Sequence, residues 1–464
     1  MCNVSLNGTQ PTDASIRVLR ALEAAGLEAW YVGGWVRDAL MGRPSHDVDM
    51  CCSGLWQESK EALEAADIAV VESGIKFGGI TAICDDERIE VTTYRLDGFY
   101  TDGRHPQSVE RAASLEDDLA RRDFTVNAMA WHPERGLVDR YDGQGDLDRK
   151  LIRAVGDPKR RFNEDALRML RAVRFACRLD FMIEPKTKQA LAECAPLLDA
   201  VARERVGIEL EGILSTGHGG DAMLRYPELI CAAVPELAPA RGFDQSSVYH
   251  AFNVYEHIAR VLTVAGELAL CDGVAPSSSL MWAAFLHDVS KPECFSVDHA
   301  GSGHFYGHPE LGAKKARVIM DRLALSHDLV RDVCLLIKYH DKPLRPERSC
   351  LLNMMRALSG EGVDTPRLMD ELMDLKRADT LGKAPSCFYY VETIEEIRAM
   401  AHELLKAGEP YTLKMLAING GDLIRAGVKP GPELGQLLNS ALDAVIEDNI
   451  SNEREALLVH LNLN

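Results

Sequence analysis

The pattern of apolar and polar positions divides the chain into two parts. In the first part, short apolar runs predict strands, and longer runs with helical spacing lie between them. The predicted strands cover residues 28–32, 46–51, 68–71, 77–84 and 88–95, and the helical patterns cover 14–26 and 55–66. From about residue 151 onward the strand signals disappear. The pattern therefore predicts an α/β head of about 150 residues followed by a helical remainder.

Length and composition narrow the class of protein. A chain of 464 residues is too long for one hydrophobic core, so we expect several domains. The predicted division is a head at 1–150, a helical neck at 151–240, a second helical domain at 241–385 and a helical tail at 386–464. The longest uninterrupted apolar run, 280–286, is far shorter than the roughly 20 residues of a membrane-spanning helix. Because the polar start also lacks the apolar core of a signal peptide, we expect a cytoplasmic protein.

The distribution of charge favours a local contact with nucleic acid. The net charge of −19 argues at first against such a partner. Residues 149–178, however, hold ten Lys and Arg against three Asp and Glu. A basic patch inside an acidic protein predicts RNA binding that is concentrated in the neck.

Residues 31–50, YVGGWVRDALMGRPSHDVDM, combine several features of a phosphate site. The glycine pair at 33–34 lets the backbone turn sharply and bring N–H groups toward an anion. Arg37, one turn into the next helix, can fork onto phosphate oxygens. Asp47 and Asp49 lie two apart on a predicted strand and so share one face. Two such carboxylates can hold one or two Mg²⁺ ions, and the stretch predicts a site for a metal-bound triphosphate.

Two further segments of the head bear on this site. Glu90 is the one acid of the strand segment IEVTTYR, where it is either a third carboxylate near the metals or a solvated residue at a strand end. Residues 97–118 combine Gly, Pro and mixed charges without periodicity. This composition predicts a mobile loop.

An arginine stripe is predicted on a helix that starts near Asp165. At about 100° per residue, one flank is apolar and the opposite flank is basic. The apolar flank holds Met169, Leu170, Val173 and Cys177, and the basic flank holds Arg168, Arg171, Arg174 and Arg178. Asp165 and Arg168, three apart, form either a salt bridge on a solvated helix or a pair that faces a ligand. So many arginines with few acids nearby would repel one another, which favours a bound anion.

The chemistry of the Asp165 and Arg168 side chains matches two of the four bases. A carboxylate accepts hydrogen bonds, whereas a guanidinium donates them. Cytosine and adenine each present an amino donor beside a ring-nitrogen acceptor, and uracil and guanine present an oxygen and an N–H instead. Held side by side, the two residues would therefore accept C and A and reject U and G.

The helical half carries a second constellation, made of histidine and aspartate. Its members are His257, His287, Asp288, His308, His340 and Asp379. Imidazole and carboxylate ligands suit a transition metal or a mixed dinuclear site, although a single helical histidine is more often a packed or surface residue. The set resembles the HD-type phosphohydrolases, in which these positions hold a metal such as Mn, Fe or Ni. Lys291, just after the His-Asp pair, could then contact a phosphate.

The ordered motifs resemble one family along most of the chain. GG-x-VRD-x-L-x-G followed by D-x-D is similar to the head of the class II tRNA nucleotidyltransferases, or CCA-adding enzymes, and of the related bacterial poly(A) polymerases. The similarity continues through RRDFTVNAMAW (121–131), YDGQGDLDRKLIRAVGDP (141–158) and RRFNEDALRMLRAVRFACRLDF (160–181). LAINGGDLIRAGVKPGPELGQLL (416–438) resembles the C-terminal part of the HD-bearing members.

This resemblance implies a fold, an activity and a set of site residues. It implies a polymerase-β-like nucleotidyltransferase head with a mixed sheet, an all-α neck, an HD-type domain and a helical tail that meets the tRNA elbow. The implied activity is the template-independent, Mg²⁺-dependent addition of C, C and A to tRNA from CTP and ATP. The loop at 97–118 would help to switch to the terminal A. The matching magnesium ligands are Asp47 and Asp49, and the matching nucleotide-binding residues are Gly34, Arg37, Arg122, Asp165, Arg168, Arg171 and Arg174.

Three other interpretations remain open at this point. A poly(A) polymerase would share the head, but the loop and the Asp165–Arg168 pair favour CCA addition. An HD phosphohydrolase acting on RNA ends or nucleotides would use the head only to bind RNA, and the intact D-x-D motif argues against that. A binding protein with inactive sites would have lost carboxylates, and none is visibly lost.

Overall fold

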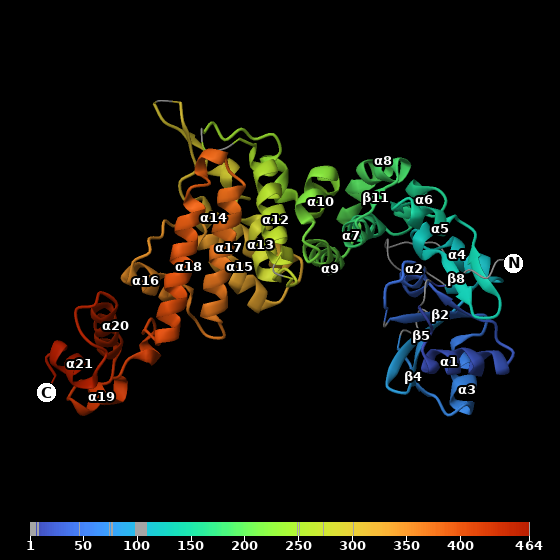
Figure 1. The fold of residues 1–464 in the computed structure, drawn as a ribbon, viewed down its shortest axis with the longest axis horizontal. Coiled ribbons are helices and arrows are strands. Elements are labelled where there is room, and N and C mark those ends of the chain that lie inside the picture. The colour runs from blue at the N-terminus through green and yellow to red at the C-terminus, as the bar shows by residue number, and fades with distance from the viewer. Residues whose placement is uncertain are drawn as a thin grey trace. The chain divides into compact units, whose positions relative to one another are not determined.

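The protein forms two compact units in the computed structural model, which describes residues 6, 9–45, 47–73, 75, 78–97, 109–247, 249, 251–271, 273–299 and 301–463. Unit 1 comprises Met1–Ile213 with Tyr226–Ala233, and unit 2 comprises Leu214–Arg225 with Val234–Asn464. Unit 1 contains the main sheet, and unit 2 is almost entirely helical (Figure 1).

A seven-stranded mixed sheet forms the centre of the head. In spatial order its strands are β3 Ala69–Val71, β4 Gly79–Cys84, β5 Glu87–Thr93, β2 Val48–Cys52, β1 Ala29–Val32, β8 Met129–His132 and β9 Gly136–Asp139. β2 and β5 run parallel, and the other neighbours are antiparallel. The predicted mixed α/β head is thereby confirmed. β8 and β9 were not predicted, because four residues each are too few to show a clear alternation.

Three helices cover the sheet and close its core. They are α1 Asp13–Ala24, α2 Gly34–Leu40 and α3 Trp56–Ala65. The side chain of Thr12 caps α1 by accepting a hydrogen bond from the amide of Ser15 at 3.2 Å. Val18 and Leu22 then lie on one buried face of α1. All four residues of β1 are buried, which explains its uninterrupted apolar sequence.

A tight hairpin sets the register that matters for the site. Asp85 and Asp86 turn between β4 and β5 with φ of 48° and 64°, a left-handed conformation that aspartate tolerates better than most residues. This is the turn predicted between the two strands. Because β5 continues in parallel beside β2, Glu90 pairs directly with Asp49.

The neck packs helices against the head within unit 1. They are α5 Gly143–Asp148, α6 Pro158–Glu164, α7 Arg168–Leu179, α8 Pro185–Cys194, α9 Arg203–Leu214 and α11 Pro227–Ala233. The prediction of one helix running on from Asp165 is wrong. Asp165 has an extended backbone, with φ −145° and ψ 106°, and it ends α6, while α7 begins only at Arg168. The angular argument therefore holds inside α7, where Met169 and Val173 are fully buried.

Short strands also occur after residue 150, contrary to the expected all-helical remainder. β10 Leu151–Ile152 pairs in parallel with β11 Met182–Ile183, and β12 Ser296–Val297 pairs with β13 Gly303–His304. Each has two residues, so no periodicity could reveal it.

The predicted loop at 97–118 lies largely outside the described residues, since 98–108 are not described. Its flanks are β6 Arg95–Asp97 and β7 Val109–Arg111, which pair antiparallel. Its end is helical, because α4 Leu115–Ala120 begins after Ser114, whose side chain accepts from the amide of Asp117 at 3.3 Å. The loop prediction is therefore wrong for this last part.

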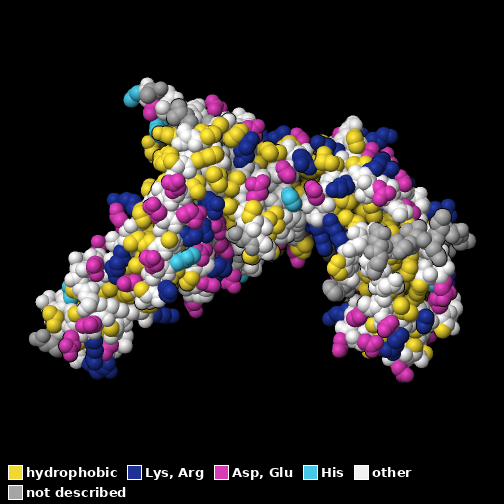
Figure 2. Space-filling view, viewed as in Figure 1, with side chains coloured by type: hydrophobic (Ala, Val, Ile, Leu, Met, Phe, Trp, Pro, Cys, Tyr) yellow, Lys and Arg dark blue, Asp and Glu magenta, His cyan; other side chains and the backbone are white. Residues whose placement is uncertain are grey.

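Unit 2 is a helical body followed by a short helical tail. The helices are α10 Gly219–Arg225, α12 Val254–Cys271, α13 Ser278–Leu286, α14 His308–Arg322, α15 His327–Tyr339, α16 Arg348–Leu358, α17 Thr365–Leu381, α18 Tyr390–Ala407, α19 Gly420–Arg425, α20 Pro432–Ile446 and α21 Arg454–His460. The apolar run 280–286 lies in α13, and it is buried among α12, α15 and α17. Figure 2 shows acidic and basic side chains interspersed over the visible face of this unit. Among the described residues, no helix is long and apolar enough to cross a membrane.

Candidate functional site

Two carboxylates meet on neighbouring strands of the head. Asp49 on β2 and Glu90 on β5 occupy paired positions of the parallel register. Asp47 lies exposed just before β2 and adds to the negative field at Asp49. Burial raises the pKa of Asp49 to about 6, and Glu90 acts in the same direction, while Arg122 opposes both. Carboxylates that repel one another in this way are a natural place for a divalent cation.

Gly33 places the backbone directly against this cluster. It precedes α2 with φ 70°, a conformation that favours glycine. A Cβ atom at Gly33 would lie 2.9 Å from Nη1 of Arg122 and 3.7 Å from Oδ2 of Asp49. Gly34 begins α2, and a Cβ there would lie 3.5 Å from Nη2 of Arg37. The sequence therefore identified the glycine pair correctly as a point of close approach.

Arg37 is held inside the head rather than in an open cleft. It is 4% exposed, and its Nε and Nη2 each donate to Asp38 at 2.9 Å. Its Nη1 donates to Oδ1 of Asn127 at 2.7 Å. These contacts bind the start of α2 to the segment before β8. The predicted contact of Arg37 with phosphate stays a prediction.

A buried carboxylate that the motif analysis did not single out holds two arginines. Asp118 is fully buried in α4 and accepts from Arg121 at 2.9 and 2.6 Å and from Arg122 at 3.2 Å. Burial alone would raise the pKa of Asp118, but Arg122 and Arg121 keep it below its ordinary value. The spacing of three and four residues on a helix is a sequence signal that could have identified this group.

The side chains of Asp165 and Arg168 are each held by other residues. Oδ2 of Asp165 accepts from Nη2 of Arg205 at 2.9 Å, and its Oδ1 accepts from the amide of Leu167 at 3.0 Å. Nη1 of Arg168 donates to Glu164 at 2.8 Å, and its Nη2 donates to the carbonyl of Arg121 at 3.1 Å. The interpretation of the pair as a salt bridge on a solvated helix is therefore wrong.

The rest of the arginine stripe has acidic partners from other elements. Arg171 donates twice to Oδ2 of Asp123, at 3.0 and 2.8 Å. Arg174 donates to Glu209 of α9 at 2.6 Å. The mutual repulsion that favoured a bound anion is thus partly relieved by acids far away in the sequence. These two acids were missed because neither belongs to the helix of the stripe.

One cavity of about 330 Å³ gathers most of these groups within unit 1. It is lined by Val32, Asp49, Met50, Glu90, Thr92, Arg95, Arg121, Arg122, Asp123, Asp165, Leu167, Arg168, Arg171 and Arg205. Six predicted site residues are among them. Arg205, Arg95 and Arg121 were not predicted. Of the described residues predicted for this site, Gly34, Arg37, Asp47 and Arg174 lie outside the lining.

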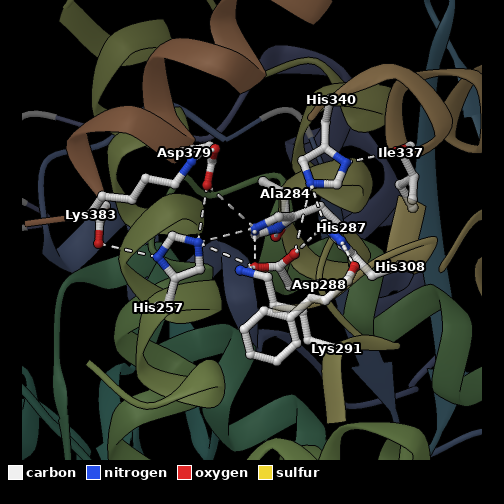
Figure 3. A network of polar contacts seen from close by, with 12 residues as sticks. His257, Ala284, His287, Asp288, Lys291, His308, Ile337, His340, Asp379 and Lys383 are labelled. Carbon is white, nitrogen blue, oxygen red and sulfur yellow. Dashed lines mark hydrogen bonds and ion pairs between the residues drawn. The ribbon is translucent and has the colours of Figure 1, made fainter. Parts of the chain in front are cut away.

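A second cluster lies in unit 2, where four imidazoles face one carboxylate. His257 belongs to α12, His287 and Asp288 follow α13, His308 begins α14 and His340 follows α15. Figure 3 shows these rings and the carboxylate of Asp379 pointing toward a shared centre. All six side chains are at least nine-tenths buried. The structure therefore brings the whole predicted set together.

Backbone carbonyls fix the orientation of every ring. Nδ1 of His287, His308 and His340 lies 2.9, 2.7 and 2.7 Å from the carbonyl three residues earlier. Nδ1 of His257 lies 3.2 Å from the carbonyl of Gly382. A proton on each Nδ1 leaves the Nε2 lone pair directed at the centre, which is the tautomer that a metal ligand needs.

Asp288 joins two groups of potential ligands. His257, His287 and Asp288 form one, and Asp288, His308 and His340 form the other. Burial alone would raise the pKa of Asp288, but His287 and Lys291 hold it well below its ordinary value. Lys291 Nζ lies 2.7 Å from Oδ2, yet neither oxygen of Asp288 has a well-formed hydrogen bond with a described residue. This donor set fits one or two transition-metal ions.

A cavity of about 320 Å³ opens beside this cluster. Its walls include the ligand candidates His308, His340 and Asp379 and the cations Lys291 and Lys383. Tyr306, which is 77% exposed, stacks on the ring of His304 at 5.2 Å and lies in the same wall. The site thus offers metal ligands, cations for a phosphate and an exposed aromatic surface.

Four segments of the chain match known family models. They are the Poly A polymerase head domain over 29–153, the probable RNA and SrmB-binding site of polymerase A over 180–240, the HD domain over 254–383 and the putative tRNA nucleotidyltransferase domain 2 over 388–461.

Similar structures have been solved for CCA-adding enzymes. The Bacillus stearothermophilus enzyme in complex with CTP is 26% identical, with a TM-score of 0.74 and coverage of 98% of both chains. The Thermotoga maritima enzyme complexed with tRNA shares the fold, with a TM-score of 0.59 at 21% identity and coverage of 100% of this chain and 98% of that one.

Curated relatives are similar over nearly their full length. A CCA-adding enzyme of Pediococcus pentosaceus is 32% identical over 454 residues, which is 96% of each chain. One of Streptococcus mutans is 32% identical over 447 residues, or 96% of this chain and 95% of that one. Because these relatives are 32% identical over nearly the whole chain, and because the head domain and the fold also match, the chain belongs to the CCA-adding enzyme family of tRNA nucleotidyltransferases.

Proposed function

We propose that this enzyme adds C, C and A to the 3′ end of tRNA without a nucleic-acid template, using CTP and ATP in the cytoplasm. One observation carries the proposal. The cavity of the head joins the Asp49–Glu90 pair to the polar groups of Asp165 and Arg168. A triphosphate held at the carboxylates could therefore present its base to the two readers within the same space.

The acidic side of the cavity suits divalent metal, which the family implies and which we assign as Mg²⁺. Asp47 and Asp49 would hold it, with Glu90 beside them. Mg²⁺ held there would supply positive charge for the triphosphate and for ionisation of the attacking 3′-hydroxyl. The raised pKa of Asp49 supports this assignment, because a cation would offset the cost of burying its charge and the repulsion from Glu90.

The arginines of the cavity supply the opposite charge. Arg122 and Arg121, both anchored on Asp118, stand near the carboxylates and would neutralise the triphosphate. Arg37 would act more indirectly, by fixing the start of α2 through Asp38 and Asn127.

Asp165 and Arg168 would read the Watson–Crick edge of the base. Each has a side-chain partner in the structure, Arg205 for Asp165 and Glu164 for Arg168, and these partners orient the two groups in the lining of one cavity. A carboxylate that accepts and a guanidinium that donates match C and A. Base binding would add to the existing contacts, since a carboxylate and a guanidinium each have further hydrogen-bonding positions.

The direct test uses tRNA transcripts that end before CCA. Each nucleoside triphosphate is supplied singly and then CTP and ATP together, and the products are resolved on a sequencing gel. We expect two nucleotides from CTP alone and three from CTP with ATP. Long products from ATP alone would identify a poly(A) polymerase instead.

The unit 2 cluster supports a second function, a metal-dependent phosphohydrolase. The observation behind it is the Asp288-centred ligand set beside a cavity that holds Lys291, Lys383 and Tyr306. A phosphate ester would bind to the cations, and a base could stack on Tyr306. Metal analysis of the purified protein and hydrolysis of 2′,3′-cyclic AMP, with or without chelator, test this proposal. Absence of both metal and hydrolysis would leave the cluster a structural one.

A further inference from the structure

A third cavity, of about 650 Å³, lies in unit 2 and shares no lining residue with the cavity beside the histidine cluster. It is lined by Glu310, Ala313, Lys314, Arg317, Arg331, Cys334, Leu335, Lys338, Ser359, Gly360, Glu361 and Val363. Its volume is within the range of sites for small organic ligands. None of these residues is among the metal ligands predicted for unit 2 or the site residues predicted for the head.

Two helices build the cavity from regularly spaced positions. On α15, Arg331, Cys334 and Lys338 are separated by three and four residues and so share one face. Lys314 and Arg317 have the same spacing on α14. The thiol of Cys334 on α15 donates to the backbone carbonyl of Ala313 on α14 at 3.3 Å, and this hydrogen bond links the two helices at the cavity.

The cations of this cavity differ in whether they form ion pairs with acidic side chains. Arg331 is paired with Asp328 at 2.8 Å and with Asp332 at 2.8 Å, so its charge is largely neutralised. Lys314, Arg317 and Lys338 are exposed and form no ion pair within the described residues. The only acids of the lining are Glu310 and Glu361. In a chain with a net charge of −19, three such cations around one cavity favour an anionic ligand.

The interior between the cations is apolar. Ala313, Leu335 and Val363 are partly buried and form part of the wall. Arg331 also donates to the carbonyl of Glu361 at 3.4 Å, which ties the segment after α16 to α15. A flat apolar group could therefore lie against the wall while its charged end meets the lysines and the arginine.

We propose that this cavity binds a nucleoside polyphosphate, with the base against the apolar wall and the phosphates at Lys314, Arg317 and Lys338. A bare polyphosphate would leave the apolar wall unused. An RNA backbone would meet the cations but would also leave the apolar wall unused.

The position of the cavity couples it to the metal cluster. α14 begins at His308, and α15 ends one residue before His340. The Nε2 atoms of these two histidines lie 3.4 Å apart. A ligand that draws α14 and α15 together acts on this distance, so occupancy of the cavity alters metal affinity, and metal alters ligand affinity by the same factor. The coupling rests on the proposed metal function, whereas the binding site does not.

The experiment titrates ATP into the full-length protein by calorimetry. The test variant removes the three cations, and the control removes three exposed lysines of unit 2 outside the cavity. The test variant is Lys314→Ala, Arg317→Ala and Lys338→Ala, and the control is Lys406→Ala, Lys414→Ala and Lys429→Ala. We expect two binding events in the wild type and the control, one from the head, and at least a tenfold weakening of the other in the test variant.

Three results would overturn the proposal. One is the lack of a second ATP-binding event in the wild type, or a second event whose affinity is unchanged in the test variant. Another is an affinity for inorganic tripolyphosphate equal to that for ATP, because this would show that the base does not contribute to binding. The third is loss of tRNA affinity, with no loss of ATP affinity, in the test variant, since this would identify an RNA contact. Equal metal affinity with and without ATP would refute the coupling while leaving the binding site in place.

Discussion

The cavity of the head and the histidine cluster of unit 2 are both rich in charge, but different contacts hold them. In the head, Arg171 is held by Asp123, 48 residues away, and Asp165 by Arg205, 40 residues away. In unit 2, three of the four imidazoles are held by the carbonyl three residues earlier. The base-reading side of the cavity thus depends on side chains that are distant in the sequence, whereas most rings of the cluster are oriented by local backbone.

This difference has a consequence for function. A ring fixed by its own helix keeps one tautomer and one direction, which suits a metal that must be bound continuously. A guanidinium or carboxylate held by another side chain can add or exchange partners, which suits nucleotides that must enter, be read and leave. We therefore expect changes in the head to alter rate and selectivity, and changes in the cluster to alter metal content.

The largest effect should come from removing Asp49. Asp49→Ala deletes a metal ligand candidate from the head, so nucleotide addition should fall by about a thousandfold or more, as expected when a metal-binding carboxylate is lost. Metal bound to unit 2 should be unchanged. Primer-extension rates and metal analysis measure the two effects, and Glu87→Ala on β5 is the control for a lost acid. Full activity of the Asp49 variant would exclude it as a ligand.

Removal of Asp288 should produce the opposite result. Because Asp288 is shared by both groups of ligands, Asp288→Ala should remove nearly all metal from unit 2 and leave nucleotide addition within about twofold of the wild type. His402→Ala, which changes an exposed imidazole of α18, should retain the metal. If metal content survives in the Asp288 variant, the cluster is not organised around that residue.

Arg168 should affect selectivity more than rate. Arg168→Ala removes the donor opposite N3 of cytosine or N1 of adenine, and a bidentate reader contributes about 1–3 kcal/mol of discrimination. Misincorporation of UMP and GMP should therefore rise about tenfold or more. Arg178→Ala, an exposed arginine of the same helix, is the matched control. Single-nucleotide incorporation with all four triphosphates decides the matter, and unchanged selectivity would defeat the base-reading model.

The smallest effect concerns the free energy of unfolding, and its size depends on pH. The folded state raises the pKa of Asp49 from 3.8 to about 6, so between these values it keeps a proton that the unfolded chain has lost. Stability of the metal-free protein therefore falls as pH rises through this window. Asp49→Asn cannot ionise and should be more stable than the wild type at pH 7, by about 1–3 kcal/mol. Urea unfolding in EDTA should show this difference shrink as the pH falls from about 6 to about 4, and a variant less stable at pH 7 would contradict the assigned burial.

Local spacing allowed the sequence to predict much of this protein. The glycine turn before α2 and the Asp85–Asp86 hairpin each depend on neighbouring residues, and each is found where it was expected. The predicted D-x-D strand is present, but it begins at Val48, so Asp49 lies on it and Asp47 lies just before it. The six residues of the unit 2 cluster were also identified, from their chemistry and their resemblance to the HD-type phosphohydrolases, and the structure brings them together. The placement of Glu90 beside Asp49 remained open until the strand order was known.

Tertiary structure alone decided which charges meet. The break at Asp165 leaves this residue outside the helix of the arginine stripe, on which the angular argument had placed it. The partners Asp123 and Glu209 come from elements far from the arginines they hold. A charge pattern along one helix cannot reveal such partners, since the free energy of a buried ion pair depends on the groups that fold against it and not on its neighbours in the chain.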